Sequence, residues 1–335
     1  MKLRVVLIAF SLALAGGIPG LITATAAPAA ASAATAAYTM TDLGNLGGGV
    51  SMGFGINASG EVVGRSYLNK VFFFKCGRHI CHFTQNDPFS WSGGTMTDLG
   101  TFNAMSMSEA NAVNSTGDVV GGSNSRAFLV HNKKMTDLGP GMATSINDFG
   151  EIVGNASSGS FLVSGGHRTT LAGFAPVGIN NHHLLAGDIG VAPEVEHAAI
   201  WNNGTITDLG TLGGLGSAAY AINDAGQVVG DSATSTGAGA AFIWQNGKMT
   251  DLGVDPIPSG INNNGLIVGN FGCGASTVIL TTGSVCQNLQ SLIPANSGYT
   301  LSEARGINDK GQIIAEASLQ SDPNHPRHSV LLTPN

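Results

Sequence analysis

Five copies of a Thr-Asp-Leu-Gly tag place an aspartate at regular points along this chain, and together these acids could form a ring of carboxylates. A side chain that returns in every copy of a repeat more often accepts hydrogen bonds at a strand end than takes part in a reaction. We therefore predict a structural role for them. The aspartates are Asp42, Asp98, Asp137, Asp208 and Asp251.

An Asn-Asp-x-Gly sequence, found at Asn147, Asn223 and Asn308, could offer oxygen ligands to calcium. Calcium in proteins takes six or more oxygens, several of them from carboxylates. Each sequence supplies a single acid, and other copies carry Ala58 or Ser115 in its place. We interpret the sequence as a tight turn, in which asparagine caps the backbone and glycine adopts a positive φ.

The densest group of ionisable residues, between His182 and His197, could be a metal site. His182 and His183 open one predicted strand, whereas Glu196 and His197 open the antiparallel strand that follows. At about 3.3 Å per residue the two pairs start from opposite ends of a hairpin, on the order of 20 Å apart. We predict no metal and no other cofactor. We also predict no catalytic residues, because no Gly-x-Ser-x-Gly nucleophile elbow stands out.

The cysteine count is even, which in a secreted chain indicates disulfides. Pairing of nearest neighbours would close two local loops, and two other pairings remain possible. The alternative for the first pair is a metal cluster with His79 and His82, but a zinc site prefers a second cysteine pair nearby. We predict disulfides for all four cysteines, which are Cys76, Cys81, Cys273 and Cys286.

A repeat positions these residues. The copy at residues 218–253 contains four short strand signals, each a run of β-branched, aromatic or small apolar residues bounded by glycine or asparagine. The turn asparagines are spaced by about 42 residues, which matches the 40 to 50 residues of a four-stranded propeller blade. They are Asn57, Asn114, Asn147, Asn180, Asn223, Asn262 and Asn308.

The chain ends carry two incomplete units. Residues 38–43 read as a fourth strand with nothing before it, and residues 328–332 read as a third strand with nothing after it. If the first completes the second, no free sheet edge is left. We therefore predict an all-β, seven-bladed β-propeller with four-stranded blades. An open solenoid would leave both fragments unexplained.

The first 33 residues predict a secretory signal peptide. Lys2 and Arg4 precede an apolar run at residues 5–15, which is too short to span a membrane, and small-x-small triplets follow. We expect a secreted protein, extracellular or in the cell envelope, with residues 34–335 as a single domain. The repeat units lie near residues 38–95, 96–135, 136–170, 171–206, 207–249, 250–287 and 288–335.

The net charge of −7 argues against nucleic acid as a partner, because phosphate binding needs clustered lysine and arginine. Charged residues make up only 10% of the chain, while aliphatic residues are frequent and regularly placed. This composition favours a folded β protein punctuated by glycine over a disordered chain.

The motifs resemble those of the bacterial extracellular HAF repeat proteins, whose units carry a His-Ala-Phe stretch before a tag like Thr-Asp-Leu-Gly. Here the resemblance rests on residues 126–128, 197–201 and 241–244 and on the five tags, and it covers nearly all of the mature chain. Residues 170–173 and 287–289 depart from the tag. The resemblance implies secretion and a β-repeat fold, and it implies no established reaction or ligand.

The loops between the second and third strands, together with the crossovers between blades, vary most in length, and binding is usually built on such loops. The longest insertion, residues 65–87, combines aromatic residues, cations and a predicted disulfide. Its alternative interpretation is an extended strand packed into the first blade. The candidate ligand-binding residues are Tyr67, Lys70, Phe72, Phe74, Arg78 and His79.

These observations predict a secreted, monomeric, non-enzymatic binding protein for a glycan, a peptide or a cell-surface partner. The alternative is a secreted lyase or hydrolase with its site at the channel mouth, which rests on analogy with other propellers. Ionisable side chains that converge at one mouth would favour the enzyme.

Overall fold

The computed structural model describes residues 36–103, 107–254, 257–272, 275–280, 286–322 and 326–335. Residues 36–335 form a compact unit by themselves, apart from residues 1–35. The predicted signal peptide therefore lies outside the described residues.

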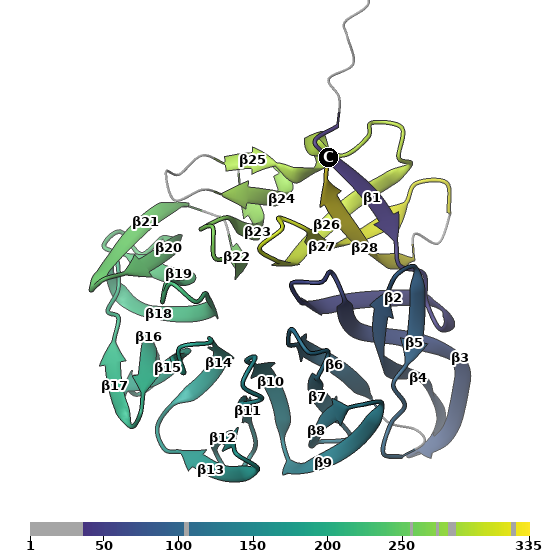
Figure 1. The fold of residues 1–335 in the computed structure, drawn as a ribbon, viewed down its shortest axis with the longest axis horizontal. Coiled ribbons are helices and arrows are strands. Elements are labelled where there is room, and N and C mark those ends of the chain that lie inside the picture. Colours follow the sequence, from purple (N-terminus) through teal and green to yellow (C-terminus); the bar gives the residue numbers. More distant parts are fainter. Residues whose placement is uncertain (1–35, 104–106, 255–256, 273–274, 281–285, 323–325) are drawn as a thin grey trace, which may run out of the picture. The chain divides into compact units, whose positions relative to one another are not determined.

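The described residues confirm the predicted all-β fold, with a single 3-10 turn, η1 (Leu289–Leu292), besides the strands. They form seven antiparallel sheets of four strands, arranged around a ring as in a β-propeller (Figure 1). No helix in the described ranges is long and apolar enough to cross a membrane. From the innermost to the outermost strand, the first four sheets are β2 (Gly47–Ile56), β3 (Val62–Cys76), β4 (His79–Ser92), β5 (Thr95–Asp98); β6 (Ser108–Val113), β7 (Val119–Ser123), β8 (Arg126–His131), β9 (Lys134–Pro140); β10 (Met142–Ile146), β11 (Ile152–Asn155), β12 (Ser160–Ser164), β13 (His167–Leu171); and β14 (Ala175–Ile179), β15 (Leu185–Ala192), β16 (Val195–Asn202), β17 (Thr205–Asp208). The other three are β18 (Gly213–Ile222), β19 (Val228–Thr234), β20 (Gly239–Gln245), β21 (Lys248–Val254); β22 (Ile257–Ile261), β23 (Ile267–Gly272), β24 (Ala275–Leu280), β25 (Cys286–Asn288); and β26 (Tyr299–Ile307), β27 (Ile313–Leu319), β28 (Arg327–Pro334), β1 (Tyr38–Asp42).

The turn between the first and second strands follows from the Asn-x-x-Gly sequence. In the copy at Asn223, the side-chain Oδ1 accepts the backbone N–H of Gln227 at 2.9 Å, and Gly226 closes the turn with a φ of 72°. The fourth copy has His183 where the others have glycine, and its φ is also positive, at 62°. Residues other than glycine adopt this conformation uncommonly, and histidine does so more often than most. Here the His183 imidazole lies 2.6 Å from the Glu151 carboxylate.

Each innermost strand carries a β-bulge three residues before its turn asparagine. In β18 the pairing with β19 passes from Ala219 to Ala221 and leaves Tyr220 unpaired. Side chains at this position can reach the next sheet, as when Asn111 Nδ2 donates to the Ala143 carbonyl at 2.8 Å. A bulge re-aims a side chain, so each sheet presents one such residue on the strands around the centre of the ring. These residues are Phe54, Asn111, Thr144, Val177, Tyr220, Ser259 and Arg305.

The hydrophobic core lies between neighbouring sheets. Val228 packs with Phe242 of its own sheet and Ala186 of the preceding one, whereas Val229 packs toward Ile261 of the following sheet. Both faces of β19 are therefore covered, which explains its apolar run in place of polar and apolar alternation.

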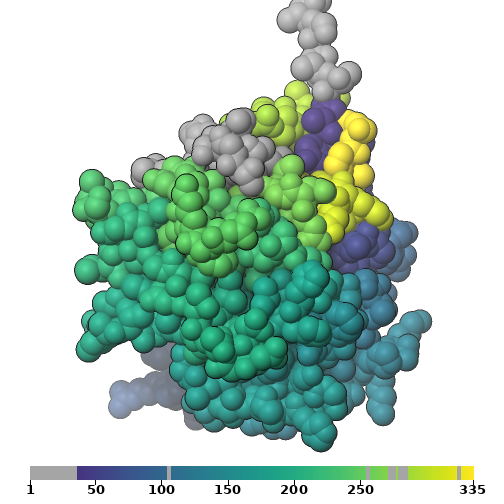
Figure 2. Space-filling view, turned by 60° about the vertical axis from the view of Figure 1, so that its left-hand side comes forward, coloured from purple at the N-terminus to yellow at the C-terminus, as the bar shows by residue number. Residues whose placement is uncertain are grey.

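The two ends of the described chain share one sheet. β1 pairs antiparallel with β28, with Tyr38 opposite Pro334 and Asp42 opposite Val330. In Figure 2 the purple N-terminal strand lies against the yellow C-terminal one. The prediction that residues 38–43 complete the last unit is confirmed, and the pairing removes a free edge of β28. Most predicted repeat units begin with the outer strand, whereas each sheet along the chain begins with its inner strand, so the boundaries differ by one strand.

The tag aspartates have the predicted structural role. Asp208 Oδ1 accepts the N–H of Gly210 at 2.8 Å, and the His197 ring lies 2.9 Å from the same carboxylate. Burial favours the neutral acid, but these two bonds outweigh it and lower the pKa of Asp208 below its ordinary value. The same bond, to the glycine two residues on, is made by Asp42, Asp98, Asp137 and Asp251.

Candidate functional site

The two ends of the ring differ in construction. The short turns after the first and third strands of each sheet lie at one end, which we call the turn end. The loops after the second strands and the crossovers between sheets lie at the other, which we call the loop end. Ligand sites could form at either mouth of the central channel.

At the turn end, the seven turn asparagines form a closed ring of hydrogen bonds. Each buried side chain donates its Nδ2 to the backbone carbonyl of the next asparagine, at 2.9 to 3.3 Å, and Asn308 returns the ring to Asn57 at 3.0 Å. A cavity of about 210 Å³ lies against this ring. The sequence predicted the turn caps but not the links between sheets, because the linked residues are 33 or more positions apart.

Three aspartates meet at this mouth, which the sequence interpretation missed because each turn alone contains one acid. Asp224 Oδ1 accepts the N–H of Asn181 at 2.8 Å. Asp148 and Asp309 make the equivalent bond, also at 2.8 Å. These carboxylates join neighbouring turns. Within the described ranges, no three His, Cys, Asp or Glu side chains are placed to share a metal ion.

The loop end concentrates exposed apolar side chains. Twelve large apolar residues are exposed in the described part of the chain, and nine of them lie at this end. Exposed apolar area gathered on one face of a protein marks an interaction surface. The nine residues are Val71, Phe73, Phe74, Ile80, Met107, Met142, Val191, Leu215 and Ile257.

β3 and β4 form a hairpin much longer than the strands on either side of it. Its outer part, residues 69–84, extends beyond the pairing with β2 and β5, and we call it the arm. The predicted insertion is thus a strand hairpin, and the alternative of packing into the first blade holds only for its base, where Leu68 is buried. The six candidate binding residues all lie on this hairpin, which places Tyr67 at its base, Lys70, Phe72 and Phe74 along β3, and Arg78 and His79 at its tip.

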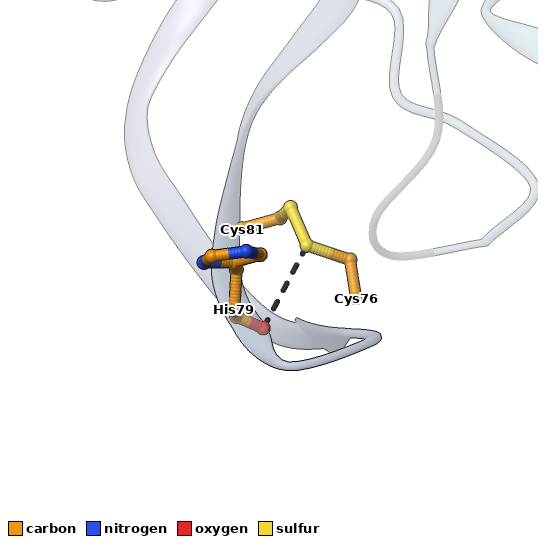
Figure 3. The surroundings of a disulfide bond; sticks show 3 residues. All are labelled: Cys76, His79 and Cys81. Atoms are coloured by element: carbon orange, nitrogen blue, oxygen red, sulfur yellow. Dashed lines mark hydrogen bonds between the residues drawn. A yellow bond between two sulfur atoms is a disulfide. The ribbon is translucent and has the colours of Figure 1, made fainter.

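A disulfide closes the tip of the arm, as predicted. Cys76 and Cys81 are bonded, with their Cα atoms 5.9 Å apart (Figure 3). The Cys76 Sγ atom also lies 3.7 Å from the carbonyl oxygen of His79. Cys286 is disulfide-bonded too, and its predicted partner Cys273 lies outside the described residues.

A groove of about 970 Å³ lies at the base of the arm, and we call it the groove. The hairpin contributes Arg65 and Phe83, while Met107, Glu109 and Met142 come from the next two sheets. Arg65 donates to Glu109 at 2.8 Å across the sheet boundary. The volume is within the range of small-ligand sites, roughly 300 to 1,000 Å³. The other lining residues are Gly122, Asn124, Ser125, Pro140, Gly141, Asn155, Ala156 and Ser157.

None of the six candidate binding residues lines the groove. The sequence placed the centre of the site on the outer arm, whereas the concave surface is at the hairpin base. Arg65 and Phe83 lie within the predicted insertion, so that signal was present. Met107 immediately precedes the first strand of its sheet and Met142 begins one, and the sequence interpretation did not use an apolar residue at these exposed positions.

A group of acids lies where the fourth and fifth sheets meet. Asp188 accepts the N–H of Ala219 at 2.9 Å, and burial, with nearby Glu196 and Asp231, raises the pKa of its carboxyl to about 6. Burial and the Asp231 carboxylate raise the pKa of Tyr220 far above its ordinary value. Asp231 Oδ1 is buried without a hydrogen-bond partner among the described residues. A carboxyl that titrates near neutral pH could act as a general acid or base.

In the first and last sheets, charged side chains make paired contacts. Phe54, the bulged residue of β2, lies 5.6 Å from the guanidinium groups of both Arg65 and Arg305. Glu316 is fully buried and accepts from Arg305 at 2.6 Å and from Arg327 at 3.2 Å. The Phe54–Arg305 contact joins the first and last sheets, so no sequence spacing could have indicated it.

The residues between His182 and His197 do not converge on one point. His183 pairs with Glu151 at 2.6 Å, whereas His197 pairs with Asp208 at 2.9 Å. The last sheet contains the same contact between a histidine and a tag aspartate, because His328 lies 2.8 Å from Asp42. Both contacts have a structural explanation.

Comparison with known proteins gives a family and a fold. The model of a family described as "Protein of unknown function (DUF3466)" matches residues 131–327, more than half of the chain. No curated protein matches the sequence.

Three similar solved structures are distant in sequence. The extracellular domain of BT4673 from B. thetaiotaomicron has 9% identity and a TM-score of 0.55, over 88% of this chain and 40% of that one. A puromycin-hydrolyzing peptidase from Mycobacterium tuberculosis has 11% identity and a TM-score of 0.53, over 87% and 53%. Virginiamycin B lyase from Staphylococcus aureus has 14% identity and a TM-score of 0.50, over 88% and 99%. These proteins differ in function, so the similarity shows the propeller fold alone.

Proposed function

We propose a binding function for this protein, which belongs to the DUF3466 family of proteins of unknown function. The ligand, a glycan, a peptide or a cell-surface partner, would bind at the loop end of a seven-bladed ring. The observation that carries the proposal is the groove of about 970 Å³, set in the end where nine of twelve exposed apolar residues of the described chain gather.

The lining of the groove suits recognition without chemistry. Phe83, Met107 and Met142 offer apolar contact, and the Arg65–Glu109 ion pair offers both signs of charge at one wall. Concave sites with an apolar lining and a few polar groups are the usual form of ligand pockets. The ends of four loops and crossovers complete the wall, and loops on a rigid scaffold tolerate the variation that specificity needs.

The cellular setting is part of the same proposal. We propose a secreted protein, outside the cell or in the cell envelope, related to the HAF repeat proteins. The Cys76–Cys81 disulfide supports it, because disulfides persist in oxidising compartments.

The test uses glycan and peptide arrays probed with the full mature chain. We expect ligands on one array whose binding falls at least tenfold in Phe83→Ala and Met142→Ala. The matched control is Phe149→Ala, which removes an exposed phenyl ring from the turn end. Equal binding by groove variants and control would refute the groove as the site.

A second candidate function, an enzyme at the channel mouth, is favoured by Asp188, whose carboxyl has a pKa of about 6 beside Tyr220. Chromogenic esters and glycosides, together with uronate polysaccharides, probe hydrolase and lyase activity. Turnover that is lost in Asp188→Asn supports this candidate, and turnover absent from the wild type, or equal in the variant, counts against it.

A further inference from the structure

The outer arm carries an apolar surface that the groove does not use. Phe73 is 73% exposed and Ile80 is 78% exposed, and Val71 shares their face of the hairpin. Phe74 is exposed on the opposite face. Large apolar side chains this open to water, at the end of a projecting hairpin, indicate that something covers them in use.

The same segment is cationic in an otherwise acidic protein. No acidic residue occurs between Ser66 and Asn86, although the chain as a whole has a net charge of −7. Lys70, Lys75 and Arg78 are all exposed on the arm. Each lysine or arginine near an anionic lipid surface is attracted to it.

We propose that the arm binds the surface of an anionic lipid bilayer. Its apolar side chains project from both faces of a two-stranded ribbon. A rigid partner docked on one face would therefore not cover the apolar side chains on the other. A lipid interface can surround the tip and cover both faces. The cations then meet the lipid headgroups while Phe73, Phe74 and Ile80 enter the boundary with the acyl chains.

The backbone sets the depth of this contact. Beyond the base of the hairpin, β3 and β4 pair only with each other, so the outer N–H and C=O groups of both strands need water or headgroup partners. Such groups cannot be left unsatisfied in the hydrocarbon core. The arm therefore lies at headgroup depth, and the charged side chains along it disfavour pairing with a further strand. The Cys76–Cys81 disulfide holds the tip in this form.

Cosedimentation of the full chain with vesicles tests the proposal. We expect binding to phosphatidylcholine vesicles that contain phosphatidylglycerol, with weaker binding at high salt, and little binding to pure phosphatidylcholine. Loss of a Phe or Ile contact corresponds to about tenfold in affinity, so Phe73→Ser/Ile80→Ser should weaken binding by about a hundredfold. Lys75→Glu/Arg78→Glu should weaken it at least tenfold and remove the preference for anionic vesicles.

Two controls separate this inference from the proposed function, on which it does not depend. Phe149→Ser removes an equally open phenyl ring from the turn end and should bind vesicles as the wild type does. Met142→Ala alters the groove from outside the arm and should also leave vesicle binding unchanged. Wild-type protein that stays in the supernatant with both lipids overturns the proposal, and so does unchanged binding by Phe73→Ser/Ile80→Ser. Loss of binding to a cell-surface protein, but not to vesicles, in the arm variants would assign the arm to a protein partner instead.

Discussion

Replacing Asn223 with alanine removes one link from the ring of turn asparagines. The substitution removes the acceptor of the buried Gln227 N–H, bonded at 2.9 Å, and one of two donors to the Asn262 carbonyl, which keeps its bond from the N–H of Gly265 at 3.0 Å. A buried polar group that loses its partner costs about 1 to 3 kcal/mol. The adjoining cavity of about 210 Å³ can admit water to the Asn262 carbonyl, so we expect a loss of roughly 2 to 4 kcal/mol in the free energy of unfolding.

Thermal unfolding followed by circular dichroism measures this loss. For a unit of about 300 residues, 3 kcal/mol corresponds to a fall in Tm of about 5 °C. The matched control is Asn202→Ala, an exposed asparagine at the end of β16 whose side chain accepts a bond from exposed Asn203, and its Tm should stay close to that of the wild type. If the two variants have the same Tm, the asparagine ring does not stabilise the fold as argued.

Three further predictions concern closure, the acid group and the buried ion network. Truncation through Leu43 should lower Tm and promote aggregation in light scattering, because it exposes the edge of β28, whereas removal of residues 1–35 should change neither. The pKa of Asp188 is about 6 in the folded state, above its ordinary value. Between about pH 4 and 6 the Asp188 carboxyl is therefore protonated in the native chain and ionised in the unfolded chain. Urea unfolding should therefore show that Asp188→Asn gains stability relative to wild type as pH rises through this window, by on the order of 2 kcal/mol at pH 7, and a constant difference would contradict the assignment. Glu316→Ala leaves Arg305 and Arg327 facing each other and should lower the unfolding free energy by about 3 kcal/mol, while Glu303→Ala, at a partly exposed position, should cost under about 1 kcal/mol. Equal losses in these two variants would show that burial of Glu316 is not decisive.

Local sequence patterns predicted the parts of the fold that depend on near neighbours. The Asn-x-x-Gly turns, the apolar second strands and the tag aspartates are each satisfied within a few residues, as in the bond from Gly210 to Asp208. Ring closure was also predictable, because residues 38–43 form a strand without a partner in their own unit. The sequence also showed that His183 replaces the turn glycine in the fourth copy. It did not show that His183 pairs with Glu151, since Glu151 belongs to the preceding sheet.

The candidate site depended on contacts between units. The groove joins Arg65 and Phe83 of one sheet to Met107 and Met142 of the next two, and no repeat spacing places these residues together. The bulges likewise give each sheet a different inward residue, at a position where the repeat gives no rule for residue type.

By itself, the sequence determined a four-stranded repeat, its turns, its closure and the disulfide at the tip of the arm, because strand pairing and turn chemistry act over short distances along the chain. Only the tertiary structure decided where concave and apolar surfaces lie. Phe73 and Phe83 occur in the same stretch of sequence, yet one is open to solvent on the arm and the other lines the groove. The difference arises because the two rings lie on opposite faces of the hairpin and Phe83 is nearer its base, where it shares the groove with Met107 and Met142, so that burial depends on which neighbouring units reach each residue.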